Sequence, residues 1–286
     1  MSGLTSDQEQ AVRSAVTTSD LKPRIISGVL LGLLALGLTY AGTVTFAALV
    51  IAIALAMAWE WGRVVRGPEI DPACIVHSAI VAAAALLAAL GYAALGFVLI
   101  VMGAILVGLL RFSEGGRLSA LGVPYVGIPA VSLLWIRADV SYGFLAVLFV
   151  LLVVIATDTF AYFGGRAIGG PRLWPRVSPN KTWSGFLAGI TAGTLVGVVF
   201  AFFLEEASYA HLAATAFVLA LVSQAGDLAE SALKRGFGVK DASALLPGHG
   251  GFLDRMDGVV FAATAAALIA LRGNLHEPAR ALLFGS

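Results

Sequence analysis

The sequence predicts an all-α, polytopic integral membrane protein with about nine transmembrane helices. Of its 286 residues, 59% are hydrophobic and only 12% are charged, whereas a soluble domain carries roughly 25% charged residues. The mean hydropathy is +0.93. The apolar residues also come in blocks of about 15–20, as a bilayer requires, and helices are the only open-chain elements that satisfy the backbone within hydrocarbon.

Nine apolar segments account for the predicted helix count. The fifth is short and contains Pro124 and Pro129, which remove helical hydrogen bonds. Trp59, Glu60 and Trp61, at the end of the second segment, are typical of an interfacial belt. In chain order the segments cover residues 25–40, 43–62, 74–91, 94–110, 122–136, 141–163, 184–204, 210–228 and 257–271.

The distribution of Lys and Arg predicts the orientation of these segments. If the N-terminus is cytoplasmic, all basic residues except Arg137, Arg272 and Arg280 fall on the cytoplasmic side, as the positive-inside rule requires. We therefore expect a multi-pass plasma-membrane protein with a cytoplasmic N-terminus and an external C-terminus. The net charge of +1 gives no global field that would attract nucleic acid, so no nucleic-acid partner is expected.

The chain divides into three parts. Residues 1–22 form a polar cytoplasmic tail, residues 23–140 form the N-terminal transmembrane helices, and residues 141–286 form a C-terminal transmembrane catalytic region with cytoplasmic loops 164–183 and 231–256. Both loops are rich in glycine and basic residues. Such loops either contact anionic lipid headgroups or direct backbone N–H groups and cationic side chains at a bound phosphate.

Among the few carboxylates inside or against apolar segments are Asp158, Asp227, Asp254 and Asp257. Helix capping, an ion pair with Arg255 or hydrogen bonds between helices would explain each one separately. Together, beside two basic loops, they predict a divalent-metal site that acts on phosphates, because carboxylate oxygens hold the ion and the ion bridges phosphate oxygens. The residues leave open whether the ion is Mg²⁺ or Mn²⁺, and whether a second, monovalent cation shares the site.

A signature of charged residues and glycines runs through the second loop. The runs "SALKR" (231–235), "KD" (240–241), "PGHGG" (247–251) and "DRMD" (254–257) resemble, at this spacing, the signature of the phosphatidate cytidylyltransferase family. Further segments that resemble this family are "DTFAYFGGR" (158–166), "SPNKTWSG" (178–185) and "GDLAESALKR" (226–235). The resemblance covers the C-terminal half densely, and the first 150 residues only as a set of spans.

The resemblance implies that the protein transfers a cytidylyl group from CTP to phosphatidic acid, giving CDP-diacylglycerol and pyrophosphate with a divalent metal. It also implies that Asp227, Asp254 and Asp257 bind the metal, and that the protein is a homodimer in contact with membrane lipid. Charge and placement add Asp158 as a further metal ligand.

The remaining site residues are assigned by charge and placement. Catalytic roles go to Lys234 and Arg235 beside the three aspartates, and a general base is not needed because the second pKa of a phosphate monoester is about 6. The predicted substrate-binding residues are Ser178, Lys181, Lys240, His249 and Arg255.

Two other functions remain open from the residues alone. A CTP-dependent lipid-alcohol kinase would need a base for its hydroxyl nucleophile and would release CDP rather than pyrophosphate. A cation-coupled transporter would use the carboxylates as ion sites, but it is expected to contain matching internal repeats, which the sequence lacks.

Overall fold

The computed structural model describes residues 30–285, apart from residues 31, 113–114 and 247–249. Its described part is helical except for one small hairpin. The helices are α2 (Thr43–Arg66), α3 (Pro72–Ala89), α4 (Ala93–Leu110), α5 (Gly116–Arg137), α6 (Gly143–Ile168), α7 (Trp183–Phe203), α8 (Tyr209–Gly236), α9 (Leu253–Ala270) and α10 (Pro278–Phe284). Strands β1 (Arg172–Trp174) and β2 (Ser178–Thr182) pair antiparallel between α6 and α7.

The prediction of an all-α, polytopic membrane protein is confirmed. Seven helices in the described part, α2 to α8, are long and apolar enough to cross a bilayer. The fifth predicted segment is a continuous helix that contains both Pro124 and Pro129.

The predicted count of nine spans is not confirmed. The first segment lies partly outside the described residues, and its described part is a short apolar helix, Gly32–Ala41. Helix α9 has 18 residues, but its first turns carry Asp254, Arg255 and Asp257, so it does not qualify as an apolar span by composition.

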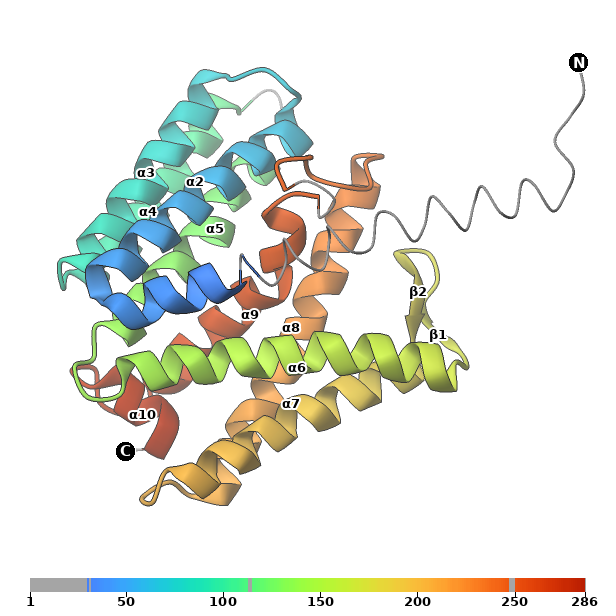
Figure 1. Ribbon diagram of the computed structural model, residues 1–286. Coiled ribbons are helices and arrows are strands. Elements are labelled where there is room, and N and C mark those ends of the chain that lie inside the picture. The colour runs from blue at the N-terminus through green and yellow to red at the C-terminus, as the bar shows by residue number, and fades with distance from the viewer. Residues whose placement is uncertain (1–29, 31, 113–114, 247–249, 286) are drawn as a thin grey trace, which may run out of the picture.

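The helices form two groups with α9 between them (Figure 1). Helices α2, α3, α4 and α5 pack against one another, and α6, α7 and α8 form the second group, in which α6 and α7 run side by side. Helix α9 contacts α2 and α5 of the first group and α6 and α8 of the second. Residues at the start of α9 are therefore in reach of side chains from both halves of the chain.

Glycines at every fourth position allow α7 to approach its neighbours closely. Gly185, Gly189, Gly193 and Gly197 share one helix face. A Cβ on Gly189 would lie 2.7 Å from the backbone oxygen of Thr157 in α6, so only glycine fits at this crossing. Small residues at this spacing are the usual device for close helix packing in membranes, and here they bring the end of α6 against the start of α7.

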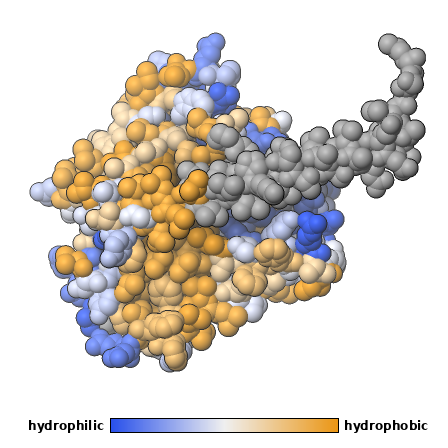
Figure 2. All heavy atoms as spheres, viewed as in Figure 1, coloured by the Kyte–Doolittle hydropathy of each residue, from blue (hydrophilic) through white to orange (hydrophobic). Residues whose placement is uncertain are grey.

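The surface agrees with a membrane location. Figure 2 shows hydrophobic residues over the middle of this face, with hydrophilic residues gathered towards its edges. Large apolar side chains on α4 and α7, such as Leu109 and Phe202, are 65% and 72% exposed. Exposure on this scale is expected where a helix faces lipid rather than water.

Two predicted loops are shorter than expected because the helices before them continue. Helix α6 ends at Ile168 and α8 ends at Gly236. Lys234 and Arg235 therefore lie on a helix, not in the loop 231–256. The loop 164–183 contains the hairpin of β1 and β2, which the sequence did not predict and whose strands orient Lys181 towards the helices.

Candidate active site

The crossing of α8 and α9 brings two of the predicted carboxylates together. A Cβ on Gly226 would lie 2.5 Å from the backbone oxygen of Asp257, and a Cβ on Gly258 would lie 2.7 Å from the hydroxyl of Ser223. The two backbones can meet only because both positions are glycine. Each glycine is the sequence neighbour of an aspartate, so the contact places Asp227 beside Asp257.

Asp257 lies in a group of like charges. Its carboxylate interacts electrostatically with Asp227, Glu230 and Asp158, and one of its oxygens accepts a hydrogen bond from the amide of Gly258 at 2.7 Å. Negative charges held together at low dielectric repel one another strongly. The arrangement is therefore suited to a bound cation.

Lys234 bridges two buried carboxylates next to this group. Its Nζ atom lies 2.7 Å from Oε2 of Glu230, one turn earlier on α8, and 2.6 Å from Oδ1 of Asp254 on α9. The side chains of Glu230, Asp254 and Lys234 are 1%, 9% and 13% exposed. One lysine thus fastens α8 to the first turn of α9.

Asp254 also holds the loop that precedes its helix. Its oxygens accept hydrogen bonds from the amides of Gly251 at 2.9 Å and Ala242 at 3.1 Å. Asp254 lies outside the seven apolar spans. Burial acts to raise the pKa of its carboxyl, but the hydrogen bonds from Lys234 and from the two amides outweigh burial and hold that pKa below its ordinary value.

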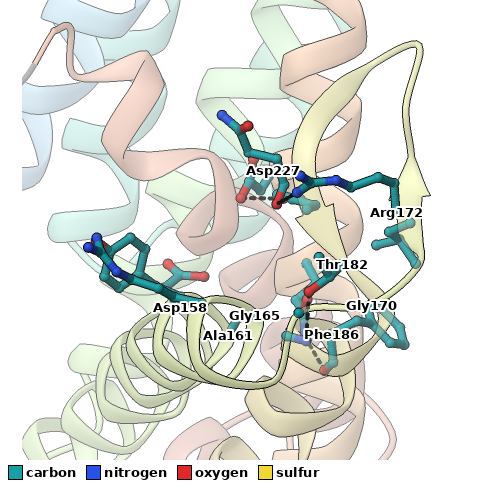
Figure 3. Close-up of a pocket in the computed structure, with 16 residues that line it drawn as sticks. Asp158, Ala161, Gly165, Gly170, Arg172, Thr182, Phe186 and Asp227 are labelled. Atoms are coloured by element: carbon teal, nitrogen blue, oxygen red, sulfur yellow. Dashed lines mark hydrogen bonds and ion pairs between the residues drawn. The ribbon is translucent and has the colours of Figure 1, made fainter.

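A cavity of about 680 Å³ opens on the other side of Asp227 (Figure 3). Asp158 of α6 and Asp227 of α8 border it, and Arg172 of the hairpin lies across from them. The hairpin also supplies Lys181, whose Nζ forms an ion pair with Asp227. Arg166, at the end of α6, completes the basic lining. The cavity thus combines three cationic side chains with two carboxylates.

Glycines line the part of the cavity between α6 and the hairpin. Gly165, Gly169, Gly170 and Gly185 all face it, and Gly169 and Gly170 have positive φ angles of 67° and 101°, which only glycine adopts easily. Backbone exposed in this way, beside arginine and lysine, is well suited to a phosphate group.

Tyr125 contributes an unexpected group from the first half of the chain. Its hydroxyl is buried and has no hydrogen-bond partner among the described residues, and its charged neighbours are Asp257, Glu230 and Asp227. A buried hydroxyl without a partner costs free energy. Its place beside the carboxylates suits it to contact a bound ligand or a metal-bound water.

The carboxylates do not form a closed cage on their own. Within the described residues, no group of three or more His, Cys, Asp or Glu side chains lies close enough to enclose a metal ion. A metal ion held by Asp227 and Asp257, with Asp158 next to them, would therefore need water or substrate oxygens to complete its shell.

The structure thus brings Asp158, Asp227 and Lys181 together at the cavity, and it places Asp257, Lys234 and Asp254 at the neighbouring α8–α9 crossing. Arg235, Lys240 and Arg255 are exposed and do not line the cavity. Ser178 starts β2 opposite Trp174 and does not line the cavity. His249 lies outside the described residues.

Sequence reasoning missed three residues of this region. Glu230 lies between Asp227 and Lys234 at spacings of three and four, so helical periodicity would have placed it on their face. Tyr125 and Glu60 gave no usable signal, because each lies in an apolar segment far away in sequence. The prediction that Glu60 belongs to an interfacial belt is wrong, since Glu60 is fully buried.

Comparison with known proteins identifies the family. The model of the cytidylyltransferase family matches residues 22–271. The phosphatidate cytidylyltransferase of Brucella abortus biovar 1 (strain 9-941) is 42% identical over 262 residues, covering 91% of this chain and 96% of that protein. The protein of the same name from Bacillus subtilis (strain 168) is 30% identical over 255 residues, covering 85% of this chain and 94% of its own.

The matched region begins before α2 and ends at the last residues of α9, so it contains both helix groups, the hairpin and every carboxylate described above. The similarity to the Brucella protein extends over nine-tenths of the chain and therefore includes the plain N-terminal spans as well as the signature. The chain belongs to the cytidylyltransferase family.

Proposed function

We propose that this protein is a phosphatidate cytidylyltransferase, which transfers a cytidylyl group from CTP to phosphatidic acid in phospholipid biosynthesis. The observation that carries the proposal is a cluster of carboxylates at the α8–α9 crossing, beside a cavity with three cationic side chains, at the ends of long apolar helices. A lipid phosphate and a soluble nucleotide can meet only at such a boundary. The names of the relatives agree with this assignment.

The reaction forms one phosphorus–oxygen bond and breaks another. A phosphate oxygen of phosphatidic acid attacks the α-phosphorus of CTP, and the bond between that phosphorus and the oxygen bridging to the β-phosphate breaks. Pyrophosphate leaves with the electron pair, and CDP-diacylglycerol remains in the membrane. No proton has to be removed from the nucleophile, because its phosphate is already ionised near neutral pH.

The chain's main task is to align two polyanions. Lys181, Arg166 and Arg172 neutralise and orient phosphate groups in the cavity, and Lys234 lies where it can turn from Asp254 to a phosphate oxygen. Positioning and preorganised charge are the main sources of rate enhancement in phosphoryl transfer. In the proposal the exposed Arg235, Lys240 and Arg255 attract the nucleotide through their charge, and Ser178 and His249, which are not among the residues that line the cavity, are further candidate contacts.

A divalent cation, Mg²⁺ or Mn²⁺, completes this site in the proposal. Asp227 and Asp257 would hold it, with Asp158 and Asp254 as neighbouring carboxylates. When bound, such an ion would neutralise charge that develops on the phosphates. The proposal leaves open a second, monovalent cation beside the divalent one.

The membrane arrangement follows from the positive-inside rule. We place the N-terminus and the active-site ends of α6 and α8 in the cytoplasm, where CTP is available, and the C-terminus outside the plasma membrane. The bilayer supplies phosphatidic acid, and two copies of the chain form a homodimer.

The direct test is pyrophosphate release by the purified protein in detergent with CTP, phosphatidic acid and Mg²⁺. Asp227→Asn should abolish lipid-dependent release in a protein that remains folded. Asp139→Asn is the matched control, because Asp139 lies just before α6, at the end opposite the cavity. It accepts hydrogen bonds from the local amides of Ser141 and Tyr142 and, at 3.4 Å, from the amide of Arg280, all away from the site; this variant should retain activity. Release of CDP instead of pyrophosphate would indicate a lipid-alcohol kinase, and no turnover with any lipid phosphate would refute the proposal.

A further inference from the structure

Glu60 is a fully buried carboxylate that the reaction described above does not use. It lies near the end of α2, in the half of the chain that the sequence describes only as membrane spans. A buried carboxylate is costly unless hydrogen bonds satisfy it. Its partners therefore indicate why the residue is there.

Among the described residues, the hydrogen-bond partners of Glu60 lie in the loop before α9 and in the first residues of that helix. Oε1 accepts hydrogen bonds from the hydroxyl of Ser243 at 2.5 Å and the amide of Phe252 at 3.0 Å. Oε2 accepts one from the amide of Leu253 at 2.6 Å. Helix α9 has no capping side chain at its own N-cap residue, Phe252, so a carboxylate from another helix takes that role and interacts favourably with the positive end of the helix.

Close packing leaves little freedom at this contact. A Cβ on Gly251 would lie inside contact distance of the Glu60 carboxylate oxygens. The loop can therefore come this close to Glu60 only because residue 251 is glycine. On the other side, Trp61 is 1% exposed, donates a hydrogen bond to the carbonyl of Leu118 at 3.0 Å and packs against Tyr125. The end of α2 is thus fixed to α5 and presents Glu60 in one position.

Glu60 and Asp254 hold neighbouring backbone groups. Asp254 accepts from the amides of Ala242 and Gly251, and Glu60 accepts from those of the next two residues, Phe252 and Leu253. The first turn of α9, which carries Asp254 and Asp257, is therefore held in place by a carboxylate that is 194 residues away in sequence from the nearer aspartate.

We propose that Glu60 is a positioning residue for the reaction: it fixes the start of α9 so that Asp254 and Asp257 meet Lys234 and Asp227 of α8. The inference rests on the proposed function for its kinetic consequences, but the contact itself can be tested without catalysis. In this proposal the N-terminal half of the chain helps to position the active-site residues and does not only anchor the protein in the membrane.

Glu60→Gln is the discriminating substitution, because an amide cannot replace this carboxylate. If its oxygen faces Ser243 and Phe252, its NH₂ group faces the amide of Leu253; if it is turned round, the NH₂ group faces the amide of Phe252. Either way one backbone donor meets another donor and loses its partner. Ser243→Ala removes one of the three hydrogen bonds to Glu60, together with the local bond from the amide of Leu245 to the serine hydroxyl. It serves as a milder variant that keeps the backbone contacts of Glu60.

The matched control is Asp71→Asn. Asp71 also lies near the end of α2 and caps a helix, accepting from the amide of Cys74 at 2.7 Å, and it forms an ion pair with Arg66. Its other oxygen lies 3.5 Å from Nη1 of Arg111, just after α4. These partners lie in or next to α2, α3 and α4, away from α9. A loss that arises only from weaker folding should appear in both Asp71→Asn and Glu60→Gln.

The experiment combines two measurements on the full chain in detergent. Amide hydrogen exchange should show faster exchange over residues 250–256 in Glu60→Gln and unchanged exchange there in Asp71→Asn. Turnover per folded molecule should fall about 10- to 100-fold in Glu60→Gln, the usual effect of losing a group that orients metal-binding side chains, with a smaller fall in Ser243→Ala.

The control should keep wild-type turnover per folded molecule. Unchanged exchange over residues 250–256 in Glu60→Gln, or equal losses of turnover in Glu60→Gln and Asp71→Asn, would overturn the inference. If wild type itself shows no turnover, the proposed function fails, while the exchange measurement still decides whether Glu60 holds the start of α9.

Discussion

Lys234 is the residue whose loss should most clearly separate folding from catalysis. Its ammonium lies 2.6 Å from Asp254 and 2.7 Å from Glu230. Each contact attracts by roughly 6 kcal/mol at an effective dielectric constant of about 20, and much of this offsets the desolvation of the three groups. Removing one partner of a buried pair typically costs about 3–5 kcal/mol. Because the side chain of Lys234 is still 13% exposed, we expect the lower end of this range. Lys234→Met should lower the free energy of unfolding by about 3 kcal/mol.

Thermal unfolding in detergent measures this loss. About 3 kcal/mol corresponds to a fall in Tm of roughly 6–12 °C for a chain of this size. Lys234→Met leaves both carboxylates without the ammonium, but Asp254 keeps its hydrogen bonds from the amides of Gly251 and Ala242. The double variant Glu230→Gln/Lys234→Met also removes the charge of Glu230, so most of the Tm should return. Pyrophosphate release should stay lost in both, because neither has the ammonium that reaches the phosphate. A Lys234→Met protein that unfolds at the wild-type temperature would refute the buried charge network.

Three further predictions concern neighbouring contacts. Lys181→Met should change the free energy of unfolding by no more than about 1 kcal/mol, because the ion pair between Lys181 and Asp227 is partly exposed. It should nevertheless lower turnover roughly 10²-fold, because it removes a phosphate contact. Turnover equal to that of wild type would exclude that contact. Gly251→Ala should cost about 1–3 kcal/mol in the free energy of unfolding, since the new Cβ meets the Glu60 carboxylate. The pKa of Asp254 is lowered on folding, so its contribution is complete above its unfolded value of about 3.9 and is lost as pH falls through the lower folded value. The Tm difference between wild type and Asp254→Asn should therefore be constant near neutral pH and shrink only in strong acid.

The fold could be predicted from the sequence where each helix is decided by its own composition. The segments that became α2, α3, α4, α6 and α7 are apolar enough that only a membrane helix accommodates them. The ends of α6 and α8 could not be predicted in the same way. Both helices continue past the apolar region as amphipathic turns with Arg166 or Lys234 on them, and hydropathy alone does not distinguish such turns from a loop.

The aspartates of the site could be predicted from the sequence, but the residues that hold them in place could not. Asp158, Asp227, Asp254 and Asp257 are conspicuous because a charge in an apolar segment is costly. Glu60 and Tyr125 also lie in apolar segments, but nothing local connects them to the signature. Their roles depend on the packing of α2 and α5 against α9, which brings together residues more than 100 positions apart, and one sequence does not record that packing.

The two aspartates of α9 illustrate how placement decides what a charge does. Asp254 is held by Lys234 and by backbone amides, whereas the charged neighbours of Asp257 are other carboxylates. Asp254→Asn should therefore destabilise the metal-free protein, while Asp257→Asn should stabilise it, because the amide relieves repulsion and its oxygen can still accept from the amide of Gly258.

Metal binding should reverse the effect of the Asp257 carboxylate on stability, from destabilising to stabilising. A cation that binds only the folded protein stabilises it by about 2.7 kcal/mol at 100 times its Kd, so Mg²⁺ should raise the Tm of wild type and have little effect on Asp257→Asn. The measurement is thermal unfolding in chelator and in a Mg²⁺ series. A metal-free Asp257→Asn protein that is less stable than wild type would show that this carboxylate is already compensated within the fold. The repulsion among the carboxylates would then be absent, and the case for a metal between α8 and α9 would lose its main physical support.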